Sequence, residues 1–433
     1  MISILIEFNM KKFKLLKASV ITFISMPLSV IPCFSLSSCS EKAYSIDASD
    51  WEGVVDGRFY PDSYTVNTKN KTVTYNDATG VRFLRLVLPN YVNYHGHHYK
   101  VLLGPKCFSE NLWLAESIEL NDFIDTIPDE CFYCCHNLND VIFHRYPKNI
   151  GNFAFSETPC TTIHVKTNGR IDDKWYIYLQ SIGGWAFYKS WISGDIIFSK
   201  DLRHLGQFAF AECSNLQNVN MQYVIGLYTI QKATFEGCSS LTSVHIPSSL
   251  TAIGDEAFQM CTGLQKIYVP RDGMSISLGN DAFYSCNVLQ DFSRDIEFTS
   301  IGDRCFWQNT DLKIQPWLPK FNTHSIGIDA FASCSISSIS FDPNVIVNVD
   351  NTAFAYCTNL RCIDFSKYTP NIGAPKWTGR GIFNNVSESG TIYVAHNFAF
   401  SDDWKSFFDK SGLVIDQHSW KIIEVAQEGD NNE

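Results

Sequence analysis

A phenylalanine that usually follows a small residue returns at nearly regular intervals over most of this chain. Successive copies are separated by 24, 23, 32, 23, 25, 23, 25, 23, 25, 23 and 29 residues. A fixed period of this size is typical of solenoids, in which each unit packs only against its neighbours. The steps of 32 and 29 residues indicate insertions around residues 169–178 and 368–381. We expect the repeated phenylalanines to be the structural anchors: Phe108, Phe132, Phe155, Phe187, Phe210, Phe235, Phe258, Phe283, Phe306, Phe331, Phe354 and Phe383.

The unit at residues 253–270 shows what one repeat contributes. Its Ile-Gly pair starts a turn, and Phe258 heads a short helical or 3₁₀ segment that directs the ring into the core. Leu264, Ile267 and Val269 point inward, the last two with the two-residue period of a strand. One unit cannot cover this apolar face, whereas stacked units can. The sequence therefore predicts an α/β repeat, with one short strand and one short helix or 3₁₀ turn per 23–25 residues.

This pattern resembles the BspA-like leucine-rich repeats of bacterial surface proteins, whose units read approximately Ile-Gly-x-x-Ala-Phe-x-x-Cys-x-x-Leu-x-x-Ile-x-Ile-Pro. The copies at Phe235, Phe258 and Phe354 match best, and the resemblance covers residues 104–394. It implies a leucine-rich-repeat solenoid and a surface protein of a host-associated bacterium. Adhesion or host-protein binding, known for some members, is a further implication, although no single ligand is implied.

Both ends of the solenoid depart from the repeat, as they must if each is to present one polar outer face. Residues 51–103 are rich in strand-forming segments and predict an N-terminal capping region ahead of a solenoid over residues 104–394. Residues 395–433 predict a C-terminal cap and tail. Within it we expect a capping helix around Trp404 and a last strand from Trp420 to Val425.

The first 38 residues read as a signal peptide. A lysine-rich stretch precedes an apolar segment from Ala18 to Phe34, which is short and interrupted by proline and so poorly suited to span a membrane. Met10 is an alternative start.

The apolar segment is followed by Leu-Ser-Ser-Cys, which resembles the bacterial lipobox and implies that Cys39 carries a lipid. Cys33 is a competing position, and an ordinary cleaved signal peptide is the alternative. Residues 39–50 would then be a tether. The resemblance implies an exported protein that is lipid-anchored to the bacterial outer membrane at the cell surface, with the lipid as its only membrane contact.

Composition excludes several classes of function. The formal net charge is −11 and no basic block occurs, so nucleic acid is not an expected partner. The sequence shows no nucleophile–base set, no paired carboxylates, no phosphate-binding loop and no HExxH motif. Its glycines recur with the repeat and are turn residues. We expect a monomer without catalytic activity and without a cofactor.

The fifteen cysteines raise the question of disulfides. Seven follow an anchor phenylalanine by three residues: Cys135, Cys213, Cys238, Cys261, Cys286, Cys334 and Cys357. Equivalent positions in stacked strands lie about 4.8 Å apart, within reach of a disulfide, but their side chains run parallel. A buried ladder of reduced thiols that donate weakly to the turn backbone is favoured, and disulfides stay open. Cys362 is expected on the open sheet face.

Two further clusters could hold a metal. Cys131, Cys134 and Cys135 resemble half a zinc site but lack a second pair. The His95-Gly96-His97-His98 segment lacks a Cys or Asp to complete a site, and a turn with its bend at Gly96 explains it equally. We expect no metal.

Residues that alternate with the buried pair of each strand should project from the open sheet face, where solenoids usually bind. A polar surface with aromatic members suits recognition, although a merely solvated face is polar too. The partner expected here is an extracellular or host protein. The alternative is a glycan-binding accessory lipoprotein for nutrient capture, which would stack sugars on Tyr268 and Tyr393. The candidate ligand-binding residues are His164, Asn218, Asn220, His245, Lys266, Tyr268, Asp364 and Tyr393.

Overall fold

The computed structural model describes residues 63–77, 85–110, 116–293, 296–312, 324–344, 348–416 and 419–425. These residues all belong to one unit of the chain, residues 47–433. The predicted signal peptide, Cys39 and the tether lie outside the described residues, as do residues 51–62 and 426–433.

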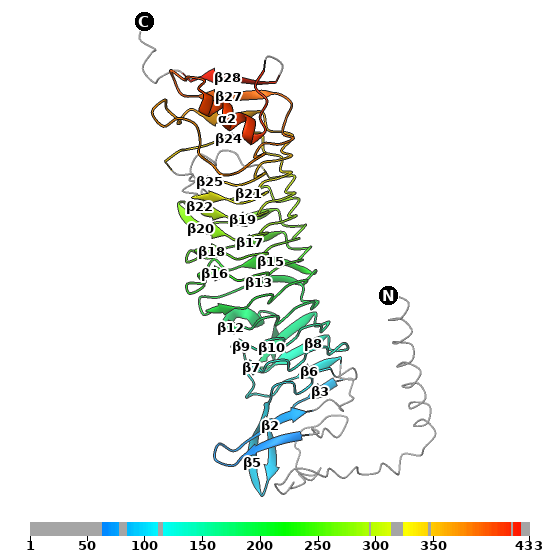
Figure 1. Cartoon of the computed structure of the whole chain (residues 1–433). Coiled ribbons are helices and arrows are strands. Elements are labelled where there is room, and N and C mark those ends of the chain that lie inside the picture. Colours follow the sequence, from blue (N-terminus) through cyan, green and yellow to red (C-terminus); the bar gives the residue numbers. More distant parts are fainter. Residues whose placement is uncertain are drawn as a thin grey trace, which may run out of the picture. The chain divides into compact units, whose positions relative to one another are not determined.

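The coils stack in sequence order, and their longer strands form parallel sheets along one face (Figure 1). Three such sheets follow one another, with orders β10-β8-β6-β3, β13-β15-β17-β19-β21 and β24-β26-β27. Two further strands extend them: β11 (Arg170–Asp172) pairs antiparallel with β10, and β28 (Trp420–Glu424) pairs parallel with β27. The side chains of these strands alternate between buried and solvent-facing, as in Lys266, Ile267 and Tyr268. The strands are β3 (Arg85–Val87), β6 (Ser117–Glu119), β8 (Asp140–Phe143), β10 (Thr162–Thr167), β13 (Gly194–Ile197), β15 (Leu216–Asn220), β17 (Ser243–His245), β19 (Lys266–Tyr268), β21 (Asp291–Phe292), β24 (Ser338–Ser340), β26 (Cys362–Phe365) and β27 (Gly390–Val394).

A second set of strands forms two further parallel sheets, so the prediction of one strand per repeat was incomplete. Most of these strands have two residues and end at the hydrophobic residue before the repeat glycine, as at Ile253. Two residues are too few to show a period in the sequence. The set is β7 (Thr126–Ile127), β9 (Asn149–Ile150), β12 (Ser181–Ile182), β14 (His204–Leu205), β16 (Thr229–Ile230), β18 (Ala252–Ile253), β20 (Met274–Leu278), β22 (Ile296–Ile301), β23 (Ser325–Ile326) and β25 (Asn348–Val349).

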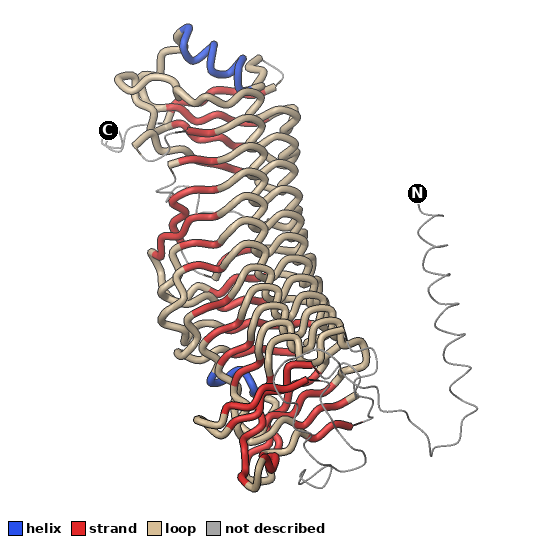
Figure 2. Tube along the Cα trace, turned by 60° about the horizontal axis from the view of Figure 1, so that its bottom comes forward, coloured by secondary structure: helices blue, strands red, loops and turns tan. Residues whose placement is uncertain are grey.

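The segment around each anchor phenylalanine consists of turns, and the predicted helical or 3₁₀ segment was wrong. The residues two before and two after every anchor have positive φ, for example 59° at Glu256 and 57° at Met260. Their N–H groups, with that of Phe258, donate to carbonyls of the following coil at 2.8–2.9 Å. Backbone that alternates between left- and right-handed conformations directs these N–H groups along the stack, whereas a helix would use them internally. This edge is therefore a third hydrogen-bonded ladder, visible as the loop stack in Figure 2.

The anchor rings fill the core between the three ladders. All twelve are buried, and each stacks on the next with ring centroids 5.1–5.9 Å apart and interplanar angles of 17° or less. The core is thus a column of near-parallel rings, one per coil, held by dispersion and by exclusion of water.

A small separate sheet precedes the first coil. It contains β1 (Ser63–Asn67), β2 (Thr72–Asp77), β4 (Tyr91–Tyr94) and β5 (His97–Leu103) in the order β1-β2-β5-β4. The turn between β4 and β5 contains His95 and Gly96, both with positive φ, so the histidine segment forms the hairpin turn considered above. The predicted N-terminal region also included β3, but this strand pairs with β6 and belongs to the solenoid sheet.

At the other end, α2 (Asp402–Ser411) and β28 (Trp420–Glu424) occupy the positions expected for a helix and a last strand. The helix begins after Ser401, whose side chain accepts the Trp404 N–H, and ends at the left-handed Gly412. β28 pairs in parallel with β27. None of the helices among the described residues has the length and apolar character needed to cross a bilayer.

The 32-residue step contains a real insertion. β10 continues into a hairpin with β11 (Arg170–Asp172), and a 3₁₀ helix, η2 (Trp175–Tyr178), follows. The η2 helix contacts both β10 and β13, which belong to different sheets. The insertion therefore interrupts the sheet between these two coils.

Candidate functional site

Five of the predicted ligand-binding residues lie together on β15, β17 and β19. The register places Asn218 beside Ser243 and Lys266 in one row. A second row contains Asn220, His245 and Tyr268. We call Asn218, Asn220, His245, Lys266 and Tyr268 the central patch.

The aromatic row of the central patch is ordered by ring stacking. The His245 and Tyr268 rings are nearly parallel, with centroids 4.2 Å apart, and Lys266 Nζ lies 5.7 Å from the Tyr268 centroid. Partial burial lowers the pKa of His245, which favours a neutral imidazole at pH 7. Tyr268 remains 37% exposed. The pair thus presents an amphipathic edge that stacking holds in one orientation.

The polar row is fixed by hydrogen bonds across the coils. Asn218 donates through Nδ2 to Asp195 Oδ1 at 2.7 Å, and its Oδ1 accepts from Ser243 at 2.7 Å and Thr242 at 2.8 Å. Asn220 Oδ1 accepts the Gln222 N–H at 3.0 Å. Side chains held this way lose little further freedom when a partner binds.

An open groove of about 690 Å³ lies beside the aromatic row, lined by His245 and Tyr268 together with Gln222, Asp272 and Ser293. Gln222 belongs to residues 221–228, which connect β15 to β16 and which we call the apolar loop. The sequence analysis did not identify this loop. The loop could have been recognised from its large apolar residues, because Tyr223, Ile225 and Tyr228 fall outside the inward positions of the repeat. Their side chains are 60%, 60% and 61% exposed.

The other three predicted ligand-binding residues lie on two other sheets, one that contains β10 and one that contains both β26 and β27. His164 is on β10, where Nδ1 contacts Asp173 Oδ1 at 2.5 Å. Asp364, on β26, accepts from the Ser340 hydroxyl at 3.0 Å and the Ser366 N–H at 2.8 Å. Tyr393 is its neighbour on β27 and is half-buried. The structure does not bring these residues to the central patch.

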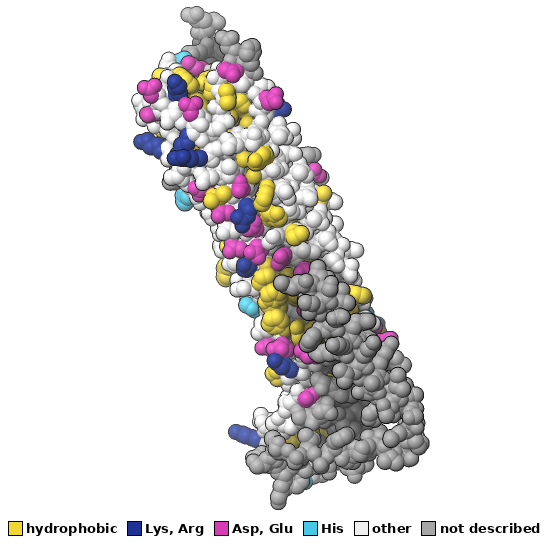
Figure 3. Space-filling model, turned by 45° about the vertical axis from the view of Figure 1, so that its right-hand side comes forward, with side chains coloured by type: hydrophobic (Ala, Val, Ile, Leu, Met, Phe, Trp, Pro, Cys, Tyr) yellow, Lys and Arg dark blue, Asp and Glu magenta, His cyan; other side chains and the backbone are white. Residues whose placement is uncertain are grey.

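Aromatic side chains also lie on the edge formed by the turns. Trp185 stacks between Phe153 and Phe208, with centroid distances of 5.9 and 4.0 Å. On the face seen in Figure 3, hydrophobic side chains gather in a band along the coils that charged groups interrupt. Because the Phe153, Trp185 and Phe208 rings use their faces against one another, we assign them to contact between coils.

All seven repeat thiols donate to the carbonyl of the preceding anchor phenylalanine. The Sγ–O distances are 2.9–3.1 Å, as for Cys261 and Phe235 at 3.0 Å. Burial raises the pKa of six of these thiols, to about 12 for Cys213 and Cys357; the other four are Cys238, Cys261, Cys286 and Cys334. The thiols thus act as donors to the turn backbone. Cys362 lies half-buried on the open sheet face, as expected.

Within the described ranges, no group of three His, Cys, Asp or Glu side chains is placed to hold a metal ion. In the half-zinc motif, Cys135 donates to the Phe108 carbonyl, while Cys134 lies 3.7 Å from Glu157.

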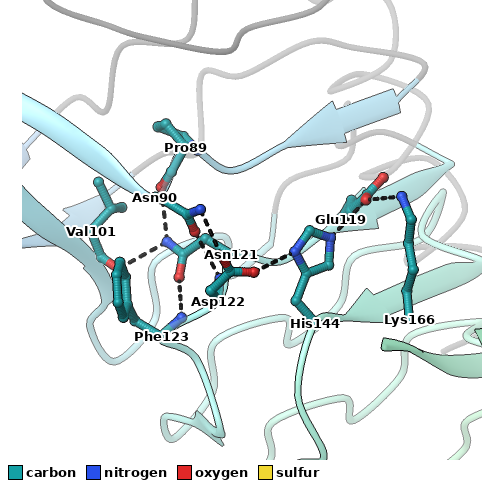
Figure 4. A network of polar contacts seen from close by, with 9 residues as sticks. All are labelled: Pro89, Asn90, Val101, Glu119, Asn121, Asp122, Phe123, His144 and Lys166. Carbon is teal, nitrogen blue, oxygen red and sulfur yellow. Dashed lines mark hydrogen bonds and ion pairs between the residues drawn. The ribbon is translucent and has the colours of Figure 1, made fainter. Parts of the chain in front are cut away.

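A buried carboxylate near the first coils was not anticipated from the sequence. Glu119 accepts from Arg85 at 2.6 Å. It also accepts from Lys166 at 2.7 Å and contacts His144 Nε2 at 2.7 Å (Figure 4). Burial alone would raise the pKa of Glu119, but these hydrogen bonds outweigh it and lower the pKa to about 2.

Nearby, the buried Asn121 donates to the carbonyls of Pro89 and Val101 at 2.9 Å. The Glu119 cluster joins residues on or next to β3, β6, β8 and β10, and Asn121 adds a contact to β5 of the N-terminal sheet, so the arrangement is structural. Its residues are far apart in sequence and carry no shared motif.

A comparison with protein families agrees with this architecture. The family model for BspA-type leucine-rich repeat regions matches six copies, over residues 101–179, 180–313 and 276–406. A comparison with curated proteins found no match.

Solved structures that resemble this chain include a leucine-rich repeat protein from Bacteroides ovatus, 19% identical, with a TM-score of 0.48, covering 87% of this chain and 100% of that one. The pneumococcal vaccine antigen PcpA is 15% identical, with a TM-score of 0.42 and coverage of 84% and 97%. A leucine-rich cell surface protein from Faecalibacterium prausnitzii is 17% identical, with a TM-score of 0.31 and coverage of 84% and 93%. On the family match, which spans most of its length, the chain belongs to the BspA-type leucine-rich repeat family.

Proposed function

We propose that this protein is a lipid-anchored surface protein that binds an extracellular or host protein through the central patch and the apolar loop. The observation that carries the proposal is the exposure of Tyr223, Ile225 and Tyr228, each about three-fifths exposed, in a loop that borders the groove. Exposing large apolar side chains costs solubility and adds nothing to the core, so such clusters commonly mark protein interaction sites.

The central patch adds oriented polar groups and an aromatic side chain beside the apolar loop. Asn218 and Asn220 offer polar groups that are already oriented, and Tyr268 is an aromatic residue of the kind that carries binding energy in interfaces. Oriented polar groups beside exposed apolar ones favour a protein partner. Membership of a repeat family that suggests interaction or adhesion supports the same assignment.

Surface anchoring rests on the sequence of the leader. Cys39 would carry the lipid, and the tether would separate the membrane from the solenoid. Substitution of Cys39→Ser should abolish incorporation of a labelled fatty acid and release the protein from membranes. Protease treatment of intact cells should remove the solenoid if it faces outward. Continued labelling of Cys39→Ser, or full protection from protease, would contradict this part of the proposal.

The glycan alternative relied on Tyr268 and Tyr393 as one sugar-stacking surface. Tyr268 and Tyr393 lie on different sheets, and the His245 ring covers one face of Tyr268. Two sugar rings could not stack on these tyrosines as one site. A protein partner is therefore the better occupant of the central patch.

The test is binding of the purified protein to extracellular-matrix proteins and host cells, comparing two variants. The first combines Tyr223→Ser, Ile225→Ser and Tyr228→Ser, and should lose at least tenfold in affinity because three exposed contacts are removed. The second, Tyr356→Ser, changes a tyrosine that is 56% exposed on the turn edge and should bind normally. Equal binding by both variants, or no binding to any such protein, would refute the proposal.

A further inference from the structure

The side chain of Arg203 lies against the apolar loop. Arg203 comes immediately before β14, and it meets the loop of the next coil at Gly226. A Cβ atom on Gly226 would lie 2.6 Å from Arg203 Cδ and 3.3 Å from Nη1, so the arginine occupies the space that a side chain would need. Because Gly226 follows Ile225 directly, the glycine brings the guanidinium group beside the exposed apolar residues of the loop.

Two backbone carbonyls orient the Arg203 guanidinium group from one side. Nη1 donates to the carbonyls of Lys200 and Leu202, the latter at 3.1 Å. Neither Nε nor Nη2 has a hydrogen-bond partner among the described residues. These two nitrogens form the edge through which a guanidinium group binds a carboxylate with two parallel hydrogen bonds. Arg203 is exposed, so a partner can reach them.

The charges around Arg203 favour a single carboxylate over a run of them. Lys200 and Arg203 are both exposed, and neither forms an ion pair with a described carboxylate, although Asp201 lies between them. The whole chain carries a net charge of −11, so a polyacidic partner would be repelled by the rest of the surface. One carboxylate at Arg203 interacts mainly with the local cations, because physiological salt screens charges beyond about 8 Å.

The apolar loop sets the surroundings of that carboxylate. Tyr223, Ile225 and Tyr228 are each about three-fifths exposed. Apolar side chains of a partner that cover these residues would exclude water from the ion pair, and a charged hydrogen bond is stronger where water is excluded. We infer that the partner contacts the apolar loop through an apolar segment carrying one carboxylate, which Arg203 binds; this inference rests on the protein-binding surface proposed above.

Arg361 separates a structural role from a binding role. Its Nη1 donates to the carbonyls of Thr358 and Leu360, at 2.7 and 3.2 Å. These carbonyls lie three residues and one residue earlier in the chain, as do those that Arg203 contacts. The two arginines thus make the same contacts within the chain, and Arg203 differs in lying against the apolar loop. Substitution of Arg361 therefore controls for the loss of those contacts.

The experiment selects random short peptides displayed on phage against the purified protein. Peptides that also bind the Tyr223→Ser, Ile225→Ser and Tyr228→Ser triple variant are discarded, which leaves those that need the apolar loop. The retained peptides should carry an aspartate or glutamate among apolar residues. Each is then synthesised with its acidic residue and with the matching amide, and the affinities are measured by calorimetry. Loss of the carboxylate should weaken binding by about tenfold or more.

Arg203→Gln should weaken the acidic peptide by the same factor and leave the amide peptide unchanged, because the carboxylate and the guanidinium group act on each other. Arg203→Lys keeps the charge but loses the two parallel donors, so it should recover only part of the affinity. Arg361→Gln should bind both peptides like the native chain. Equal thermal unfolding of Arg203→Gln and Arg361→Gln shows that the first variant keeps its fold.

Retained peptides without an acidic residue would overturn the inference and leave the apolar loop as a binding surface. The same holds if Arg203→Gln weakens the acidic and amide peptides equally, since Arg203 would then act only on the structure of the loop. If no peptide depends on the apolar loop, the inference is also wrong. The proposed function is decided separately, by the binding of whole extracellular proteins described above.

Discussion

The backbone carbonyl of Ser411 accepts a hydrogen bond from the N–H of Phe383 at 2.8 Å, and the carbonyl of Lys410 accepts from Gly381 at 2.9 Å. In the turn ladder, the N–H groups of each coil donate to carbonyls of the following coil. The N–H groups of the last coil therefore have no following coil to donate to. A helix leaves its last carbonyls without partners. The last carbonyls of α2 therefore accept hydrogen bonds from the N–H groups of the last coil, and each set of backbone groups satisfies the other.

Removing the packing that holds α2 should open this end of the solenoid. Trp404 is 3% exposed and contacts Phe365, so Trp404→Ala should cost about 3–5 kcal/mol in free energy of unfolding. Hydrogen exchange should be faster at the Gly381 and Phe383 amides than in the unmodified protein. Lys405→Ala, on the exposed side of the helix, should leave exchange unchanged. Unchanged exchange in Trp404→Ala would show that α2 does not protect the last coil.

The ring column makes each anchor phenylalanine a large contributor to stability. Phe258 is fully buried between Phe235 and Phe283, at centroid distances of 5.4 and 5.3 Å. Phe258→Ala should cost about 3–5 kcal/mol in urea unfolding, through lost transfer energy and a cavity. Met260→Ala, which is 51% exposed in the same coil, should cost no more than about 0.5 kcal/mol. A loss below about 1 kcal/mol at Phe258 would argue against the column.

One coil carries an asparagine at the position where seven other coils carry the donor thiol. Asn309 follows Phe306 by three residues, is fully buried, and neither side-chain amide atom has a hydrogen-bond partner within the described structure. Asn309→Cys should place a thiol near the Phe283 carbonyl and stabilise the protein by about 1–2 kcal/mol, because the unsatisfied amide is removed. Asn309→Val supplies no donor and should gain less. A Cys variant that is less stable than the native chain would contradict this account of the position.

Stability should fall in acid because of Glu119. Its pKa is depressed in the folded state, so the contribution is fully present above the unfolded value of about 4.5 and is lost as pH falls toward 2. Unfolding by urea at pH 7, 4 and 3 should show a smaller pH dependence in Glu119→Gln than in the native chain. Glu388→Gln, at an exposed site, should behave like the native chain.

The thiols should divide into two classes. The seven repeat thiols are buried, and burial raises the pKa of those from Cys213 to Cys357, so all seven should react with a maleimide only after unfolding. Cys134 and Cys362 are half-buried and should react first in the folded protein. Counting thiols in denaturant without reductant should find the seven repeat thiols free. A chain that is largely oxidised would overturn the hydrogen-bonded ladder.

Much of the architecture could be predicted because it recurs. The spacing of the phenylalanines, the inward positions in the strand of Ile267, and the outward positions of Lys266 and Tyr268 each follow from a period repeated many times. The helix around Trp404 was predicted from its composition alone. The short strands and the left-handed turns were not, because two residues show no period and because charged residues such as Glu256 rarely adopt positive φ.

By itself, the sequence determined that the chain stacks coils around one phenylalanine per repeat, since only a periodic apolar residue can form a continuous column. The tertiary structure decided which outward residues become neighbours. It gathered Asn218 and Tyr268 into one patch, placed Tyr393 on another sheet, and laid Arg203 against the apolar loop. The reason is physical: the insertion interrupts the sheet after β10, and which side chains meet across coils depends on that break. No local pattern in the sequence carries this information.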